Sequence, residues 1–193
     1  MLGKERLCAL ILCAGASFTA HAVDATTAAD PGFQLGIGAG QSNWSLPDLP
    51  GSDDLHAVGF QAFFGYRLFR YVAFEGSYID GGSLSRSIPV TQGASLSIST
   101  RPHLASATAL GILPLSQDYS LFARAGADHA WYDTHVAVTG VGSTTVGLRS
   151  NEFIWGAGGS MYVDHALLRA EYEQTKVNPG QLRLISISIV WML

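Results

Sequence analysis

Ile185-Ser-Ile-Ser-Ile-Val-Trp-Met-Leu193 is the stretch of sequence that decides the fold. Apolar residues occupy every second position in it, and serines lie between the first three. Successive side chains of a strand point to opposite faces, so this period of two predicts a strand with one apolar face. The strand reaches the final residue, so we expect the chain to end inside a sheet, as the closing strand of a barrel does. The expected apolar face consists of Ile185, Ile187, Ile189, Trp191 and Leu193.

The composition of the whole chain is more apolar than that of an ordinary soluble protein. Of its 193 residues, 48% are hydrophobic and only 13% are charged, whereas about 25% charged residues are usual in soluble proteins. A chain of this length is expected to form a single domain. The net charge of −4 gives no electrostatic reason to expect nucleic acid as a partner.

The first 22 residues have the pattern of a secretory signal peptide. Basic residues near the start precede an apolar stretch, and Ala20-His21-Ala22 matches a small-residue cleavage site. We therefore expect a signal peptide over residues 1–22 and a single mature domain over residues 23–193. A membrane anchor is the alternative, but the apolar stretch is shorter than the roughly 20 residues that span a bilayer.

Both cysteines, Cys8 and Cys13, lie in the expected signal peptide. A leucine precedes each of them, where a lipoprotein signal requires a small residue. The mature chain would then have no disulfide and no thiolate metal site. It also has no uninterrupted apolar run of about 18 residues, so we expect no transmembrane helix. A closed β-barrel is the other structure that satisfies every backbone hydrogen bond within lipid.

Eight segments of the expected mature chain alternate with a period of two. Long connections over residues 45–55, 81–92 and 135–145 alternate with short turns. An even number of strands with short turns at one end and longer loops at the other is typical of outer-membrane barrels. We predict an all-β fold, an eight-stranded antiparallel up-and-down transmembrane β-barrel. Its strands are expected at residues 33–44, 56–68, 71–80, 94–113, 119–134, 146–163, 166–176 and 182–193.

The polar face of these strands decides between a soluble barrel and a membrane barrel. A soluble barrel turns its apolar face inward, and a membrane barrel turns it outward. A polar face in water would carry many lysines, yet Lys176 is the only lysine after residue 22. We therefore expect the apolar face to contact lipid. Aromatic residues near the strand ends suit interfacial girdles: Trp44, Tyr66, Tyr71, Tyr78, Trp131, Tyr162, Tyr172 and Trp191.

Three stretches resemble the family of OmpA-like and OmpX/Ail-like outer-membrane barrels. Gly65-Tyr-Arg-Leu-Phe-Arg-Tyr-Val-Ala-Phe-Glu-Gly-Ser-Tyr78 is similar to the second hairpin of that family, and Phe122-Ala-Arg-Ala-Gly126 to its fifth strand. Ala157-Gly-Gly-Ser-Met-Tyr162, followed by Arg169-Ala-Glu-Tyr172, is similar to the hairpin of its sixth and seventh strands. The resemblance covers almost the whole mature chain. It implies a lumen plugged by inward ion pairs, with Glu75, Arg124, Arg169 and Glu171 among them.

The alternation also places a larger set of charges on the inward face, with Gln61 and His103 beside them. Inward charges must be paired, because an isolated buried charge costs several kcal/mol. Two residues depart from the family pattern: Met161 stands where an inward acid is expected, and Leu193 stands where the terminal residue is usually Phe. The predicted lumen ion-pair network is Arg67, Glu75, Arg101, Arg124, Asp128, Arg169, Glu171 and Glu173.

The sequence shows no catalytic constellation. A lipid A deacylase needs a His and a Ser close together on one lipid-facing strand, but His103 and Ser106 are three apart and point to opposite faces. His129, Asp133 and His135 share a strand face and form a conceivable metal site. Histidines at a barrel rim are usually only solvated, so we predict no metal and no cofactor.

These observations predict a non-enzymatic protein of the cell outer membrane. Its role would be structural or surface-interacting through the extracellular loops, and membrane integrity and adhesion are what the resemblance implies. A narrow channel for small solutes and a lipid A-modifying enzyme are the alternatives. Expected partners are outer-membrane lipids, lipopolysaccharide, the barrel-assembly machinery, periplasmic chaperones and a host or cell-surface ligand. We expect the assembly machinery to recognise the terminal strand through Ile185, Ile187, Ile189, Trp191 and Leu193.

Overall fold

The computed structural model describes residues 31–45, 55–91, 94–138, 140, 142–177 and 180–193. No helix in this part of the chain is long and apolar enough to cross a membrane. The predicted signal peptide and most of the loop at 45–55 lie outside the described residues. The described strands are β1 Gly32–Ser45, β2 Leu55–Phe69, β3 Val72–Asp80, β4 Leu84–Thr91, β5 Ala94–Pro114, β6 Tyr119–Val138, β7 Gly142–Val163, β8 Ala166–Val177 and β9 Gly180–Met192.

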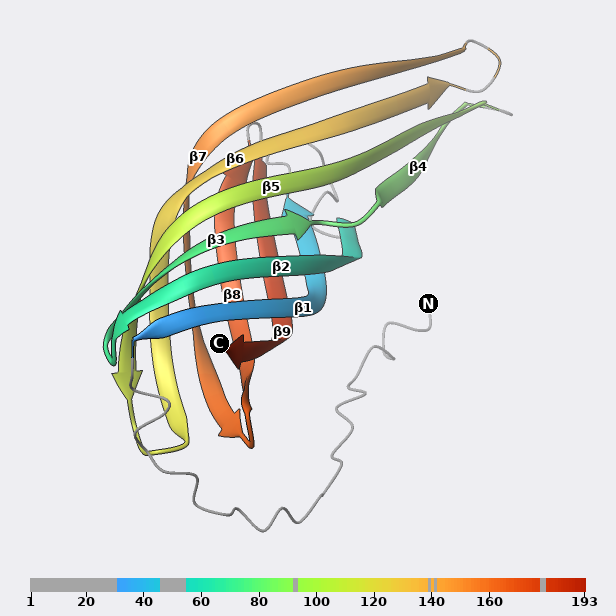
Figure 1. The fold of residues 1–193 in the computed structure, drawn as a ribbon. Coiled ribbons are helices and arrows are strands. Elements are labelled where there is room, and N and C mark those ends of the chain that lie inside the picture. The colour runs from blue at the N-terminus through green and yellow to red at the C-terminus, as the bar shows by residue number, and fades with distance from the viewer. Residues whose placement is uncertain (1–30, 46–54, 92–93, 139, 141, 178–179) are drawn as a thin grey trace, which may run out of the picture.

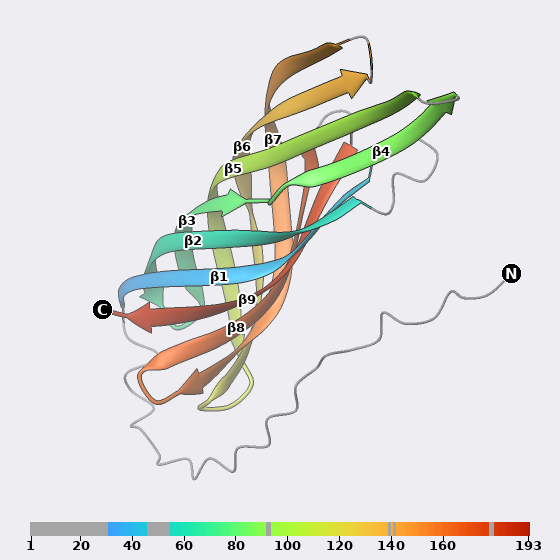
Figure 2. The same ribbon diagram turned by 90° about the vertical axis from the view of Figure 1, so that its right-hand side faces the viewer.

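Eight of these strands form a closed ring (Figure 1 and Figure 2). Each neighbouring pair is antiparallel, and the ring runs in the order β1, β2, β3, β5, β6, β7, β8 and β9 before β9 returns to β1. The β9–β1 ladder extends from Gln34↔Met192 to Ser45↔Gln181. The predicted all-β barrel is therefore confirmed, together with the closure of the ring by the C-terminal stretch.

Strand β4 lies outside the ring and corrects the prediction of a loop at residues 81–92. It pairs with the first part of β5, from Leu84↔Thr100 to Thr91↔Ala94, while β3 pairs with the rest of β5. Serines alternate with larger residues in this segment, which suits a strand, and its proline is tolerated because β4 is an edge strand.

The ring strands differ greatly in length. Strands β5, β6 and β7 contain 21, 20 and 22 residues, whereas β3 contains 9. The three long strands, with β4 beside them, therefore extend beyond the rest of the ring (Figure 1). We call this four-stranded extension the projecting sheet; it comprises residues 84–91, 94–101, 132–138 and 142–150. The predicted loop at 135–145 thus consists mostly of strand.

Short turns join the strands at the opposite end of the ring, which we call the turn end. Asp164 and His165 form a two-residue turn between β7 and β8, and Asp164 has a φ of 51°, a conformation that Asp adopts more readily than most residues. At the turn between β5 and β6, the backbone N–H of Tyr119 donates to the hydroxyl of Ser116. The chain also ends here, where the N–H of Leu193 donates to the carbonyl of Phe33. We call the end with the projecting sheet the loop end.

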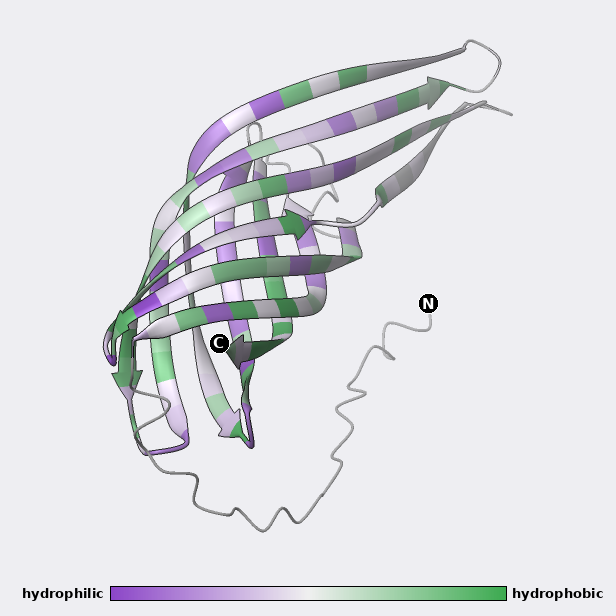
Figure 3. Cartoon of the chain, in the orientation of Figure 1, coloured by the Kyte–Doolittle hydropathy of each residue, from purple (hydrophilic) through white to green (hydrophobic). Residues whose placement is uncertain are grey.

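Most strands turn their apolar face outward, and Figure 3 shows the alternation along them. On β9, Ile185, Ile187 and Ile189 are 57%, 60% and 45% exposed. Strand β5 is the exception to the predicted facing, because Leu104 and Leu110 point into the barrel and are almost fully buried. Between His103 and Leu113 the outward residues of this strand are alanine and glycine. The larger apolar side chains of this stretch lie on the inward face, so its more hydrophobic face lines the lumen and does not contact lipid.

The lumen is filled in layers. Near the loop end, an apolar layer contains Trp44, whose ring makes an edge contact with Tyr132 at 5.5 Å. Toward the turn end, Phe63 and Phe122 belong to two smaller apolar clusters. Trp44 and Tyr162 thus pack inside the barrel rather than in the interfacial girdles predicted for them. The charged side chains lie between the apolar layers.

Candidate functional site

Five charged side chains meet in the middle of the lumen. The two terminal nitrogens of Arg169 contact the two carboxylate oxygens of Glu75 at 2.8 and 2.9 Å. Arg124 lies 2.8 Å from Glu173 and 3.2 Å from Glu171. All five residues are buried, with at most 4% of their surface exposed. We call this group the charged layer: Glu75, Arg124, Arg169, Glu171 and Glu173.

The strand alternation places these charges. On β8 every second side chain points inward, so Arg169, Glu171 and Glu173 form a row facing Arg124 of β6. Polar neighbours complete the layer, because a buried carboxylate needs donors at its remaining oxygens. They are Gln34, which donates to Glu75 at 2.6 Å, and Gln61, which donates to Glu171 at 2.6 Å and to Ser186 at 2.9 Å.

Arg169 is also held between two aromatic rings. Its guanidinium carbon lies 4.7 Å from the ring centroid of Phe63 and 4.4 Å from that of Phe122. A guanidinium over an aromatic face is attracted to it, more strongly when both groups are desolvated. Phe63, which stands among the small and polar residues on the inward face of β2, is thus a packing surface for the charge. An aromatic residue at an inward position is the sequence signal for this role.

Three predicted members of the network lie elsewhere. Arg67 is buried but lies toward the turn end, where it lines a cavity. Asp128 points inward, but its carboxylate accepts a hydrogen bond from the backbone N–H of Glu152 at 3.2 Å, and no described arginine or lysine lies within ion-pair distance. Arg101 lies on the outer surface and pairs with Asp80. The prediction for Arg101 is wrong because β5 faces the other way.

The inverted facing of β5 explains one more correction, and the register of β7 provides another. His103 lies on the outer surface, where its Nδ1 is 3.0 Å from the hydroxyl of Tyr78. Inward positions of β5 carry Thr108 instead, whose hydroxyl accepts a hydrogen bond from Arg124 at 2.9 Å. On β7, Met161 lies on the outward register and Ser160 points inward, with its hydroxyl 2.7 Å from that of Ser120. Met161 therefore does not take the place of a lumen acid.

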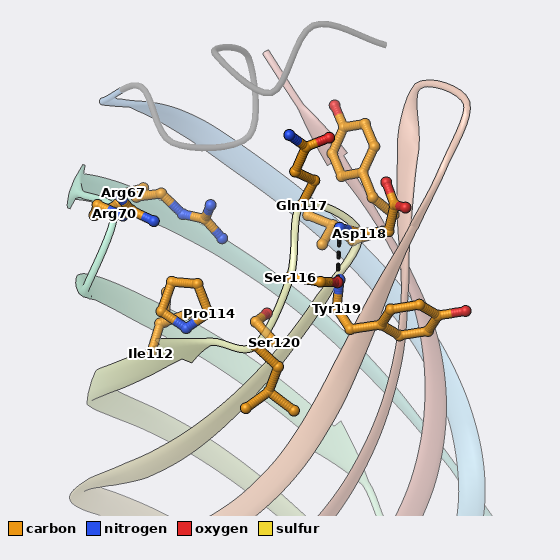
Figure 4. Close-up of a pocket in the computed structure, with 12 residues that line it drawn as sticks. Arg67, Arg70, Ile112, Pro114, Ser116, Gln117, Asp118, Tyr119 and Ser120 are labelled. Atoms are coloured by element: carbon orange, nitrogen blue, oxygen red, sulfur yellow. Dashed lines mark hydrogen bonds between the residues drawn. The ribbon is translucent and has the colours of Figure 1, made fainter. Parts of the chain in front are cut away.

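A cavity of about 330 Å³ opens at the turn end (Figure 4). Arg67 and Arg70 line it together with residues of the β5–β6 turn. Beyond it, toward the charged layer, the remaining void is only about 20 Å³, which is room for about one water molecule. The cavity is therefore a blind recess at the turn end.

The rim histidines do not converge. His129 is hydrogen-bonded to Asn151 with 2.6 Å between Nδ1 and Oδ1, and His135 lies 3.0 Å from the hydroxyl of Thr145. Within the described ranges, no three His, Cys, Asp or Glu side chains are grouped so that they could hold a metal ion.

The sequence matches the family model of the outer membrane protein β-barrel domain over residues 9–191. The chain belongs to this family. The outer-membrane barrel is also similar to solved structures. Ail of Yersinia pestis is 17% identical, with 84% of this chain and 99% of that chain covered and a TM-score of 0.57.

Two further barrels are similar at comparable levels. Neisserial surface protein A is 14% identical, with 85% of this chain and 99% of that one covered and a TM-score of 0.54. The N-terminal barrel domain of OprF from Pseudomonas aeruginosa is 12% identical, with coverages of 85% and 100% and a TM-score of 0.55. No curated protein has significant sequence similarity to the chain. At these identities the likenesses show the fold of the outer-membrane barrel. Cleavage after residue 22 stays a prediction.

Proposed function

We propose that this outer-membrane barrel is a non-enzymatic surface-interaction protein whose projecting sheet binds an extended segment of an extracellular partner. The free edge of β7 carries the proposal. Residues 142–153 pair with β6 on one side, and β8 joins β7 only from Ile154 onward. Among the residues that the structure describes, no strand pairs with the other edge of this segment. Unpaired N–H and C=O groups on such an edge are a template for an added strand.

The chemistry of this edge supports strand addition. Residues 142–149 are exposed on both faces of the sheet. The segment Gly142-Ser-Thr-Thr-Val-Gly-Leu-Arg149 has no proline and no lysine, the residues that proteins use to protect an edge. Strand β4, at the other edge of the projecting sheet, contains Pro89 and a register shift next to it. The β7 edge is therefore the better template.

External ligand binding has a precedent in this fold. A structure of Ail from Yersinia pestis contains the heparin analogue sucrose octasulfate. The projecting sheet contains no lysine, and two of its three arginines, Arg101 and Arg149, lie where it joins the ring. This favours recognition along the β7 edge through main-chain hydrogen bonds over recognition of a polyanion. The charged layer and the apolar layer around Trp44 support a closed lumen, and hence a binding role in preference to a solute channel.

Two neighbouring prolines test the proposal. Successive N–H groups of a strand point to opposite edges, so one of Thr145→Pro and Val146→Pro removes an N–H that faces β6 and the other removes one at the free edge. A displayed library of random ten-residue peptides is selected against the detergent-refolded full chain. We expect enrichment of β-forming peptides, and at least about tenfold weaker binding to the edge-facing variant. A library that yields no binder, or binders indifferent to both prolines, would refute the proposal.

A further inference from the structure

An apolar groove of about 570 Å³ crosses the outer surface of β2, β3, β5 and β6 at mid-barrel. Bulky rings form its sides, and small outward residues form its floor. The contrast with β9 is clear, because the outward positions of that strand carry large isoleucines. The sides are Phe64, Tyr66 and Phe74, and the floor includes Gly76, Ala107, Ala109 and Ala125.

Strands β3, β5 and β6 carry a polar and aromatic group further toward the loop end, one outward position along β3 and two along β5 and β6. The imidazole of His103 lies flat beside Trp131, with 6.0 Å between ring centroids and 22° between planes. Trp131 also contacts the rings of Tyr78 and His129 at 6.0 and 5.8 Å. We call this group, with the Asp80–Arg101 ion pair beside it, the rim cluster: Tyr78, Asp80, Arg101, His103, His129 and Trp131.

The rim cluster keeps donors for a ligand. The side chain of Arg101 is 59% exposed although it contacts Asp80, and a guanidinium has five N–H donors, of which Asp80 takes two. Arg149 of β7 lies opposite Trp131 and is exposed. Two guanidinium groups thus flank a half-buried indole. Guanidinium groups bind phosphate well because their donors match its geometry.

The spacing between groove and cluster matches the depth of one membrane leaflet. From Ala125 to Trp131 the strand advances roughly 20 Å at ~3.3 Å per residue. A membrane strand is tilted by ~45°, so this is a depth of about 14 Å, close to half of the ~30 Å hydrocarbon core. Trp131 would then lie at the interface of the outer leaflet, and the groove would reach the bilayer midplane.

We propose that the groove and the rim cluster form one binding site for a lipid with acyl chains and a phosphorylated sugar headgroup, the chemistry of lipid A. One acyl chain lies in the groove between Phe64 and Phe74. The sugar packs against Trp131, and Asp80 and the histidines hydrogen-bond its hydroxyls. Arg101 and Arg149 hold the phosphate. The alanines of β5 are small because the chain occupies the space that larger side chains fill on β9.

Native mass spectrometry of the full chain, extracted in detergent and titrated with hexa-acylated lipid A, tests the site. Ala107→Phe fills the groove and Arg101→Ala removes a headgroup donor. Their matched controls are Ala170→Phe on β8 and Arg183→Ala on β9, both outward-facing and distant from the groove. We expect one retained lipid A per barrel, binding about tenfold weaker in each site variant, and unchanged binding in both controls.

Competition with phosphatidylglycerol and phosphatidylethanolamine identifies the ligand. The proposal requires that neither phospholipid displaces lipid A at equal concentration. Equal binding by phosphatidylglycerol, or equal losses in site variants and controls, would overturn it. All variants are first checked for heat-modifiable migration on gels, the mark of a folded barrel. If Ala107→Phe does not fold, Ala109→Leu fills the same groove with a smaller side chain and must show the same loss.

Discussion

The ring and the projecting sheet share β5, β6 and β7, but these strands are buried on one face and paired at both edges only in the ring. In the ring, each strand has a partner on both sides, and its inward face is buried against paired charges and apolar layers. In the projecting sheet, the same strands expose both faces of residues 142–149 and leave one edge without a described partner. The stability of the molecule therefore resides in the ring, and the surface open to partners is the sheet.

The largest effect on this contrast is expected from Arg124→Met. Arg124 contacts Glu171 and Glu173 in the charged layer, and removing one partner of a buried ion pair costs about 3–5 kcal/mol, because the remaining charges lose their compensation. Urea unfolding of the barrel in lipid vesicles, followed by gel migration, measures the loss. Arg149→Met in the projecting sheet is the control and should leave the unfolding midpoint unchanged. Similar losses in both variants would show that the charged layer is not the stabilising region.

A smaller loss is expected from Gly36→Ala. A Cβ at Gly36 would lie within 2.7 Å of three ring carbons of Phe63, and Phe63 in turn supports Arg169. Overpacking of this kind costs about 1–3 kcal/mol. Gly111→Ala is the matched control, because a Cβ there would have no atom within 4 Å. The same unfolding assay should separate the two variants, and an unaffected Gly36→Ala would mean that the lumen is looser than described.

The C-terminal residue tests how the ring is closed. Leu193 is 74% exposed, and its N–H donates to the carbonyl of Phe33. We predict that Leu193→Asp lowers the amount of barrel in outer-membrane fractions, because a charge is placed on the lipid-facing row of the terminal strand. Leu193→Phe should keep or raise that amount. Normal insertion of the Asp variant would contradict the prediction that the terminal strand is an insertion signal.

The smallest effect is expected from Val146→Asp in the projecting sheet. Val146 is 47% exposed, and a surface substitution of this kind usually changes stability by less than about 0.5 kcal/mol. Its unfolding midpoint should match that of the unaltered protein, while peptides selected for the β7 edge should bind less well. A large loss of stability would mean that the projecting sheet contributes to the ring.

The alternation of polar and apolar residues was sufficient to predict which face points outward on strands whose larger apolar side chains all lie on one face. On β8, Arg169 and Glu171 alternate with Leu168 and Ala170, and the predicted facing is the one in the structure. The terminal strand is equally clear. The family resemblance also predicts four of the five members of the charged layer. Pairing within the layer depends on which strands meet across the lumen, which the sequence does not specify.

The pattern failed where side-chain size and polarity disagree. On β5, the lipid-facing residues are small, and Leu104 and Leu110 fill the lumen, so the apparent apolar face was the inner one. That single inversion misplaced Arg101 and His103, and it concealed the rim cluster. Trp44 was assigned to the interface because it lies near a strand end, but the long strands β5, β6 and β7 on the opposite side of the ring enclose that level of the lumen. Strand β4 contains Pro89, which an edge strand tolerates, so a proline in this segment does not exclude a strand.

Spin labels at one position in each region test the central claim most directly. No cysteine follows residue 22, so Ile187→Cys on the ring and Val146→Cys on the projecting sheet can each be labelled alone in the membrane-inserted protein. The label at 187 should be relaxed by oxygen, which concentrates in lipid, and protected from a water-soluble nickel complex. The label at 146 should show the reverse. A label at 187 that is open to nickel would contradict a ring whose apolar face contacts lipid.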